Sequence, residues 1–234
     1  MLSACVARAV RADDAAAPPR PWAATVKLGY VQTGGNTEVL TLLAGDNLTW
    51  TSGRWVAKQD AEAVYGRDHD VENAGRYMVG LRTDYTITDR LSPYALVSWR
   101  RNTFGGINRQ LDEGAGLVFH AIIPQPQQLD LEAGAGATQR EDVTNHQDDF
   151  GNARVAGLYK YTFLGKSSLT LGTAWLVNLQ NTTDNQLDSR ISLAAPLAAG
   201  VSLTLGYDST YRNQPLPGFV KTDWTVNAGV QLTY

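Results

Sequence analysis

Few side chains in this sequence are suited to covalent catalysis. The chain has one cysteine, Cys5, and three histidines, His69, His120 and His146. Nucleophilic catalysis requires a base held beside a serine, threonine or cysteine nucleophile. No catalytic motif surrounds His120, which follows Phe119 in an alternating segment. The sequence therefore predicts no catalytic site and no enzyme activity, and His120 is interpreted as a polar imidazole inside the fold or in a loop.

An acidic segment is a candidate for cation binding. It contains Glu141, Asp142, Asn145, Asp148 and Asp149, and carboxylate oxygens are ligands that hard divalent cations prefer. The residue spacing and the turn glycine of a calcium-binding loop are absent, so a solvated acidic loop is the favoured interpretation. We therefore expect no metal site and no cofactor.

A larger set of charged residues falls on the polar positions of alternating segments. Such residues share one face of an extended strand. Facing a common interior, they either line a passage and select its solutes or pair with one another and fill the space. The candidate lining residues are Lys58, Asp60, Glu62, Arg76, Arg82, Asp84, Asp130, Glu132, Arg154, Lys160, Asp188, Arg190 and Asp223.

The segments that position these residues alternate strictly between apolar and polar side chains. In the last segment, one face carries Trp224, Val226, Ala228, Val230, Leu232 and Tyr234. The positions between them carry Asp223, Thr225, Asn227, Gly229, Gln231 and Thr233. The same period of two recurs over residues 169–179 and 201–208. A helix cannot produce this pattern, so these segments are predicted to be β-strands.

Turn signals separate the alternating segments. They include Gly34-Gly35-Asn36, Pro124-Gln125-Pro126 and Pro215-Leu216-Pro217-Gly218, whose residue types favour tight turns. Longer polar stretches cover residues 67–74, 105–110 and 142–149. The spacing predicts about twelve strands of roughly 10–14 residues in a single domain over residues 21–234. Gly80, Gly116, Gly134, Gly136, Gly157 and Gly229 are predicted to relieve curvature or make room for large interior neighbours.

The first twenty residues differ from the rest of the chain. Residues 1–20 combine a short apolar, arginine-bearing stretch with a segment rich in alanine and proline. We interpret them as the remnant of a secretory signal followed by a disordered leader. The run Leu2-Ser3-Ala4-Cys5 is similar to the lipid-attachment motif of bacterial lipoproteins, and the alternative is that Cys5 is an ordinary residue of a discarded leader.

The distribution of charges and aromatic residues favours a membrane barrel over a soluble one. A soluble carrier barrel would have an apolar interior, whereas the predicted inner faces here are charged. Trp22, Trp50 and Trp55 fall near one set of strand ends, and Tyr30 and Trp175 fall toward the other. Two aromatic belts mark membrane barrels, and an open sheet edge would leave backbone groups unsatisfied in lipid. The sequence thus predicts an all-β, closed antiparallel up-and-down transmembrane β-barrel.

The overall composition excludes two further classes. No segment approaches the roughly 18–20 apolar residues that a membrane helix needs, so a helical membrane protein is excluded. The formal net charge is −3, with 20 basic and 23 acidic residues, which gives no reason to expect a nucleic-acid partner.

The chain resembles the salt-induced outer membrane protein family, a bacterial barrel family of unknown function. The resemblance covers Trp22 to Tyr234 and rests on Trp22, Leu28-Gly29-Tyr30, Gly34-Gly35-Asn36-Thr37, Arg82-Thr83-Asp84-Tyr85, Pro93-Tyr94-Ala95, Asn102-Thr103-Phe104-Gly105-Gly106-Ile107, Gly114-Ala115-Gly116-Leu117 and Leu129-Asp130-Leu131-Glu132-Ala133-Gly134-Ala135-Gly136. It implies the outer membrane of a Gram-negative bacterium and no known enzyme activity. It also implies that the C-terminal aromatic Tyr234 is the signal recognised by the barrel-assembly machinery.

Two functions follow as expectations. The first is a non-enzymatic outer-membrane protein that serves envelope or salt-stress adaptation, as the family name suggests. The alternative is a narrow diffusion channel for ions or small polar solutes, since about twelve strands fall between side-chain-filled and open barrels. A filled or very narrow interior is the favoured prediction. The expected partners are outer-membrane lipid, lipopolysaccharide and, during biogenesis, the assembly machinery; the oligomeric state is left open.

Overall fold

The computed structural model describes residues 21–34, 39–68, 71–164 and 166–233. The predicted leader with Cys5, the turn residues Gly35 and Asn36, and the C-terminal Tyr234 lie outside the described residues. His69 also lies outside them.

Twelve strands and one short 3-10 helix make up the described fold. Their bounds are β1 (Trp22–Gly34), β2 (Val39–Ser52), β3 (Trp55–Asp68), β4 (Val71–Tyr85), β5 (Leu91–Asn102), η1 (Thr103–Gly105), β6 (Ile107–Ile122), β7 (Gln127–Asp142), β8 (Gln147–Phe163), β9 (Ser167–Asn178), β10 (Asn185–Ala198), β11 (Val201–Arg212) and β12 (Thr222–Thr233). No helix in the described part of the chain has the length and apolar character needed to cross a membrane.

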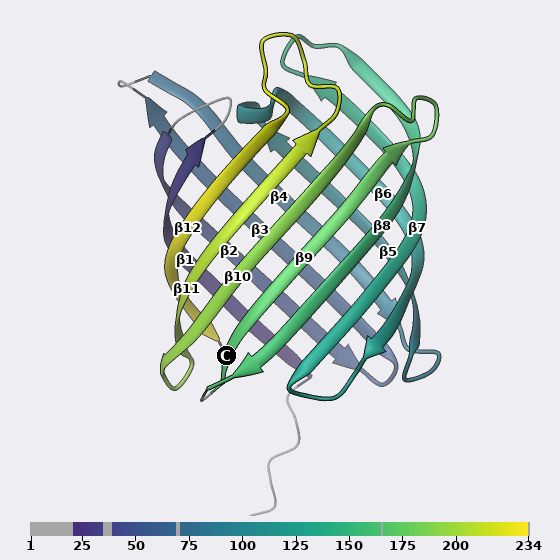
Figure 1. Cartoon of the computed structure of the whole chain (residues 1–234), viewed down its shortest axis with the longest axis vertical. Helices are drawn as coiled ribbons and strands as arrows, with labels where there is room; N and C mark the ends of the chain where they lie inside the picture. The colour runs from purple at the N-terminus through teal and green to yellow at the C-terminus, as the bar shows by residue number, and fades with distance from the viewer. Residues whose placement is uncertain (1–20, 35–38, 69–70, 165, 234) are drawn as a thin grey trace, which may run out of the picture.

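The strands form a closed barrel (Figure 1). Each strand pairs antiparallel with its neighbours in sequence, and β1 pairs with β12 to close the ring. We call the end where β1 begins and β12 ends the lower rim, and the opposite end the upper rim. The predicted fold, an all-β, closed, up-and-down barrel of about twelve strands, is confirmed.

The period-two pattern sorts the side chains between the two surfaces of the wall. On β11, Leu203 and Leu205 point outward and are 48% and 52% exposed, whereas Gly206, the next residue along the strand, faces the interior and is buried. The outward surface is therefore mainly aliphatic. Aromatic side chains gather toward the lower rim at Trp22, Trp50 and Trp55, and toward the upper rim at Tyr30, Tyr65 and Trp175.

The three predicted long loops are shorter than expected, because strand residues make up half or more of each predicted stretch. The polar stretch 67–74 was expected to be a loop, but β3 continues to Asp68 and β4 begins at Val71. Likewise β6 begins at Ile107, and β8 begins at Gln147. The ladders continue through these polar residues, with register shifts such as the one at Gly66/Arg67, because backbone pairing tolerates any side chain that can face solvent.

Two of the predicted space-making glycines lie beneath an aromatic ring in the interior. Gly116 and Gly134 pair across β6 and β7. A Cβ atom would lie 2.9 Å from Tyr94 Cε1 at Gly116 and 2.5 Å from Tyr94 Oη at Gly134. Tyr94 thus occupies the space that side chains at these positions would fill. At Gly157 a Cβ would approach Leu131 and Thr173 on the outward surface, so this glycine does not make room for an interior side chain.

Candidate functional site

The predicted lining residues all fall at inward strand positions and face one lumen. Alternation along each ladder puts them on the surface opposite to the exposed aliphatic side chains. They are Lys58, Asp60 and Glu62 on β3, Arg76, Arg82 and Asp84 on β4, Asp130 and Glu132 on β7, Arg154 and Lys160 on β8, Asp188 and Arg190 on β10, and Asp223 on β12.

One group of these charges is centred on Glu132 and stiffens the wall between β4 and β8. Glu132 accepts hydrogen bonds from Arg82 Nη1 at 2.9 Å and from Arg154 Nη1 at 2.5 Å. Arg82 also pairs with Asp84 at 2.7 Å, and Lys58 reaches Asp84 at 3.2 Å. Each charge is thus offset by a neighbour of opposite sign, as ionised groups removed from bulk water require.

A second group reaches across the lumen from β10 to β3. Arg190 lies 3.8 Å from Glu62 Oε2 and also donates to Asp208 on β11. Glu62 accepts a further hydrogen bond from Arg76. Asp60 lies beside this group on β3. Because β3 and β10 lie five positions apart in a ring of twelve strands, the Arg190–Glu62 contact crosses nearly the full width of the barrel.

Arg100 makes another contact across the lumen. Its Nη2 donates to Asp112 on β6 at 2.8 Å, and its Nη1 lies 3.7 Å from Asp188 on β10. Strands β5 and β10 are also five positions apart in the ring. Sequence reasoning missed Arg100, Asp112 and Asp208. The alternation along β5, β6 and β11 was the signal that would have included them, since they share the inward register of Ser98, Gly114 and Gly206.

These contacts surround an open space in the lumen. A cavity of about 430 Å³ is lined by five arginines and four carboxylates. They are Arg76, Arg100, Arg154, Arg190, Arg212, Glu62, Glu132, Asp188 and Asp208. Apolar side chains, including Met78 and Leu158, complete the lining. The charges sum to +1, so the cavity is polar but nearly neutral.

The upper mouth of the lumen is partly covered by η1. Arg212 Nη1 donates to the Gly105 carbonyl oxygen at 2.5 Å, which ties the end of β11 to this short helix. Thr103 Oγ1 accepts from the backbone N–H of Gly75 on β4. Gly106 has a φ of 76°, a conformation that favours glycine. The upper mouth is therefore narrowed by chain that β11 and β4 hold in place.

His120 has partners that the sequence did not reveal. Its Nε2 lies 3.1 Å from Ser92 Oγ, and its Nδ1 lies 2.7 Å from Asp130 Oδ1. This is the connectivity of a serine–histidine–aspartate triad. Ser92 is only 3% exposed, however, and none of the three residues lines the lumen cavity. The Ser92–His120 and His120–Asp130 contacts join β5, β6 and β7, so we interpret the group as a polar brace between these strands.

The acidic segment is engaged by its own chain. Asp142 accepts hydrogen bonds from the backbone N–H groups of Thr144 and His146, and Asp148 pairs with Arg140 at 2.7 Å. Glu141 accepts from Asn108 at 2.7 Å. Among the described residues, no group of three His, Cys, Asp or Glu side chains is placed to hold a metal ion.

Comparison with known proteins gives a family and a set of similar folds. The family model described as "Protein of unknown function, DUF481" matches residues 26–234. The uncharacterized protein YdiY of Escherichia coli (strain K12) is 21% identical over 203 residues, which are 87% of this chain and 79% of YdiY.

Two solved porins have similar folds. The NanC porin has a TM-score of 0.60 at 9% identity and covers 88% of this chain and 98% of its own. The KdgM porin, solved in complex with disordered oligogalacturonate, has a TM-score of 0.51 at 8% identity, with coverage of 90% and 99%. At these identities the likeness concerns the fold.

Proposed function

We propose that this chain, which belongs to the DUF481 family, is a non-enzymatic outer-membrane protein. Its lumen would serve as a narrow diffusion channel for small polar solutes. The observation that carries this proposal is the nearly neutral 430 Å³ cavity inside the barrel. A lumen used only for bracing would be filled by side chains, as in the smallest barrels. The porin-like folds of NanC and KdgM support the same reading.

The outer wall of the barrel supports a location in the outer membrane. Its aliphatic surface lies between aromatic side chains at both rims, as in barrels of the outer membrane. In the proposed orientation the lower rim faces the periplasm, because short turns belong on that side. Outer-membrane lipid and lipopolysaccharide would then contact the wall, and the barrel-assembly machinery would insert it.

The lining charges predict weak selectivity between anions and cations. Five arginines face four carboxylates in the cavity, and most are already paired within the chain. A permeating ion therefore meets no uncompensated field of one sign, whereas selective channels present rings of like charge. We expect the size of a solute to decide whether it passes. The contacts of Arg100 and Arg190 across the lumen set the upper size limit.

A second candidate function is a closed envelope barrel. The contacts Arg100–Asp188 and Arg190–Glu62 reach across the lumen and favour it, since ion pairs of this kind narrow or block a passage. In that case the protein would serve the outer membrane through its mechanical stability, including the adaptation to salt that the resemblance suggests.

Single-channel recording in planar bilayers separates the two. Refolded wild-type protein is expected to give small, uniform steps with an anion-to-cation permeability ratio near one. The double variant Arg100→Ala with Asp188→Ala removes one contact across the lumen, while Asp112 keeps its hydrogen bonds from Gln110 and Thr138. The unitary conductance of this variant should rise at least about twofold.

The outward neighbour Trp99 supplies the matched control, because Trp99→Ala leaves the lumen lining unchanged. If neither the wild type nor the double variant conducts, although both proteins are folded and inserted, the channel proposal fails and the closed barrel stands.

A further inference from the structure

Asp46 and Glu113 are acidic residues on the outward surface of the barrel wall, away from the ends of their strands. Asp46 on β2 pairs in register with Val26 and Ala61, which are outward residues. Glu113 on β6 pairs with Val97 and Ala137, which are also outward. If the barrel spans a membrane, as proposed above, both carboxyl groups face the apolar belt.

The two acids differ in depth. Asp46 lies four positions from Leu42, which pairs with Tyr30, and four positions from Trp50, which pairs with Trp22. It therefore sits midway between the upper and lower aromatic side chains, roughly 13 Å along the strand from either. Glu113 lies only two positions from the level of the Leu111–Trp99 pair.

This difference decides which acid needs a partner. The longer side chain of Glu113 can extend toward the head groups beside Trp99, as charged side chains near a membrane surface do. The short side chain of Asp46 cannot. Among the described residues, no hydrogen bond or ion pair satisfies the Asp46 carboxylate. A polar group at that depth requires a hydrogen-bond donor.

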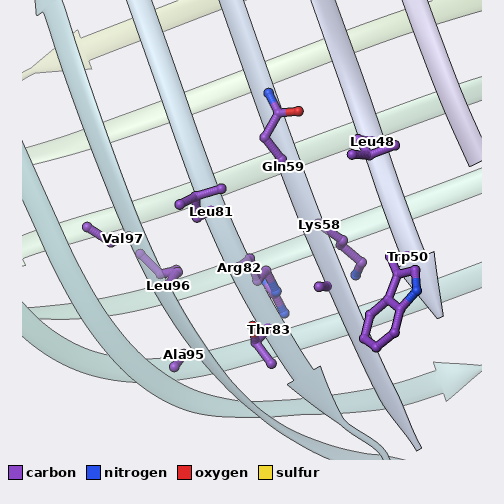
Figure 2. Close-up of a pocket in the computed structure, with 11 residues that line it drawn as sticks. Leu48, Trp50, Lys58, Gln59, Leu81, Arg82, Thr83, Ala95, Leu96 and Val97 are labelled. Atoms are coloured by element: carbon purple, nitrogen blue, oxygen red, sulfur yellow. The ribbon is translucent and has the colours of Figure 1, made fainter. Parts of the chain in front are cut away.

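The wall next to Asp46 contains a donor and a groove. Gln59 on β3 is outward and lies two positions from Ala61, the register partner of Asp46. Gln59 also borders a groove of about 460 Å³ on the wall formed by β2 to β5 (Figure 2). Leu48, Trp50, Leu81 and Val97 contribute its larger apolar side chains, with the small Ala57 and Ala95 between them.

We propose that this β2–β5 wall is the contact between two copies of the chain in the membrane, in which Asp46 of each copy accepts a hydrogen bond from Gln59 of the other. Copies inserted by one pathway share one orientation, so a two-fold axis along the membrane normal brings equal depths together. The acceptor Asp46 and the donor Gln59 lie on adjoining strands, so the same patch can pair with itself. Asp46 of each copy then meets Gln59 of the other, as a two-fold interface requires.

The groove supports a second copy over lipid as the occupant. The small outward residues Ala57, Ala61 and Ala95 let two walls approach closely, which favours packing between membrane proteins. The larger side chains beside the groove can then enter the groove of the other copy. A phospholipid would fill the groove with hydrocarbon but would bring no hydrogen-bond donor to the depth of Asp46.

Cysteine cross-linking in liposomes tests the contact directly. The full chain with Cys5→Ser provides a cysteine-free background, because Cys5 is its one cysteine. Ala61→Cys places a thiol near the proposed axis, and Leu193→Cys places one on β10, on the far side of the ring. Mild oxidation is expected to give at least about fivefold more disulfide-linked dimer for Ala61→Cys. Equal yields from the two variants would overturn the proposal.

Substitution of the two acids provides the second test. Asp46→Leu is expected to weaken dimerisation at least about tenfold by analytical ultracentrifugation in detergent, whereas Glu113→Leu should leave it unchanged. A wild type that is monomeric at every concentration, or a dimer that Asp46→Leu does not weaken, would contradict the interface. Failure of the membrane location itself is distinguishable, because the protein would then stay soluble without detergent.

Discussion

At the scale of single residues, Tyr94 shows how glycine positions determine the interior. Its ring lies over Gly116 and Gly134, where a Cβ would be within 2.9 Å of it. The Arg82 guanidinium lies 4.3 Å from the centre of the same ring, a distance at which a cation and an aromatic face attract. Tyr94 therefore joins the glycine-lined wall of β6 and β7 to the ion pairs around Glu132.

Truncating Tyr94 is expected to destabilise the barrel substantially. Tyr94→Ala empties a well-packed site and removes the contact with Arg82, so the free energy of unfolding in urea should fall by about 3 kcal/mol. Tyr94→Phe keeps the ring and should cost less than about 1 kcal/mol. Similar losses for both variants would show that the hydroxyl, and not the packing, matters.

Alanine substitutions at two glycines, Gly134 and Gly157, test the packing around Tyr94 separately. Gly134→Ala places a Cβ 2.5 Å from Tyr94 Oη, whereas at Gly157 the nearest atom is 3.7 Å away. Gly134→Ala should therefore destabilise the barrel, and Gly157→Ala should change stability by less than about 0.5 kcal/mol.

At the scale of the strand, the alternation decides what each substitution meets. Leu193 on β10 points outward and pairs with Leu205 and Leu169, while the preceding Ser192 points inward opposite Gly206. Adjacent positions of one strand thus face hydrocarbon and the polar lumen, respectively. The same rule separates Asp112, which pairs with Arg100 inside, from Glu113 outside.

An arginine scan of this pair measures the difference. Leu193→Arg should lower the free energy of unfolding in lipid vesicles by about 2 kcal/mol or more, because a cation then faces the apolar belt. Ser192→Arg should cost clearly less, since the small Gly206 leaves room in a wet lumen. Equal losses for the two variants would contradict the assigned sidedness.

At the scale of the whole barrel, paired charges hold opposite parts of the wall together. Glu132 joins Arg82 of β4 to Arg154 of β8, and the three side chains are 11%, 18% and 26% exposed. Removing the Glu132 carboxylate leaves Arg82 and Arg154 without their shared acceptor in a confined space. Such a loss destabilises far more than the breaking of a solvent-exposed pair.

Glu132→Gln is accordingly expected to lower the free energy of unfolding by about 2 kcal/mol. The matched control is Glu141→Gln near the upper rim, where the partner Arg109 is 61% exposed, and the loss should stay below about 0.5 kcal/mol. Urea titrations in the same vesicles compare the two. A negligible effect of Glu132→Gln would mean that the lumen is solvated well enough to leave its arginines unpaired.

The sequence by itself determined the strands, their number, the closed barrel and the inward register of the predicted charges. Each of these depends on local alternation and turn chemistry, which neighbouring residues carry. The loops at the upper rim are shorter than the sequence predicts, because polar residues there continue the strand pairing.

Only the tertiary structure decided which charges meet and where they lie in depth. Arg100 and Asp188 come from strands far apart in the chain, so no local pattern could pair them. The run Ala44-Gly45-Asp46-Asn47 has no clear alternation, and only its register against Val26 and Ala61 turns Asp46 outward. Ring closure sets these relations, because it fixes the opposing wall and the depth of every residue at once.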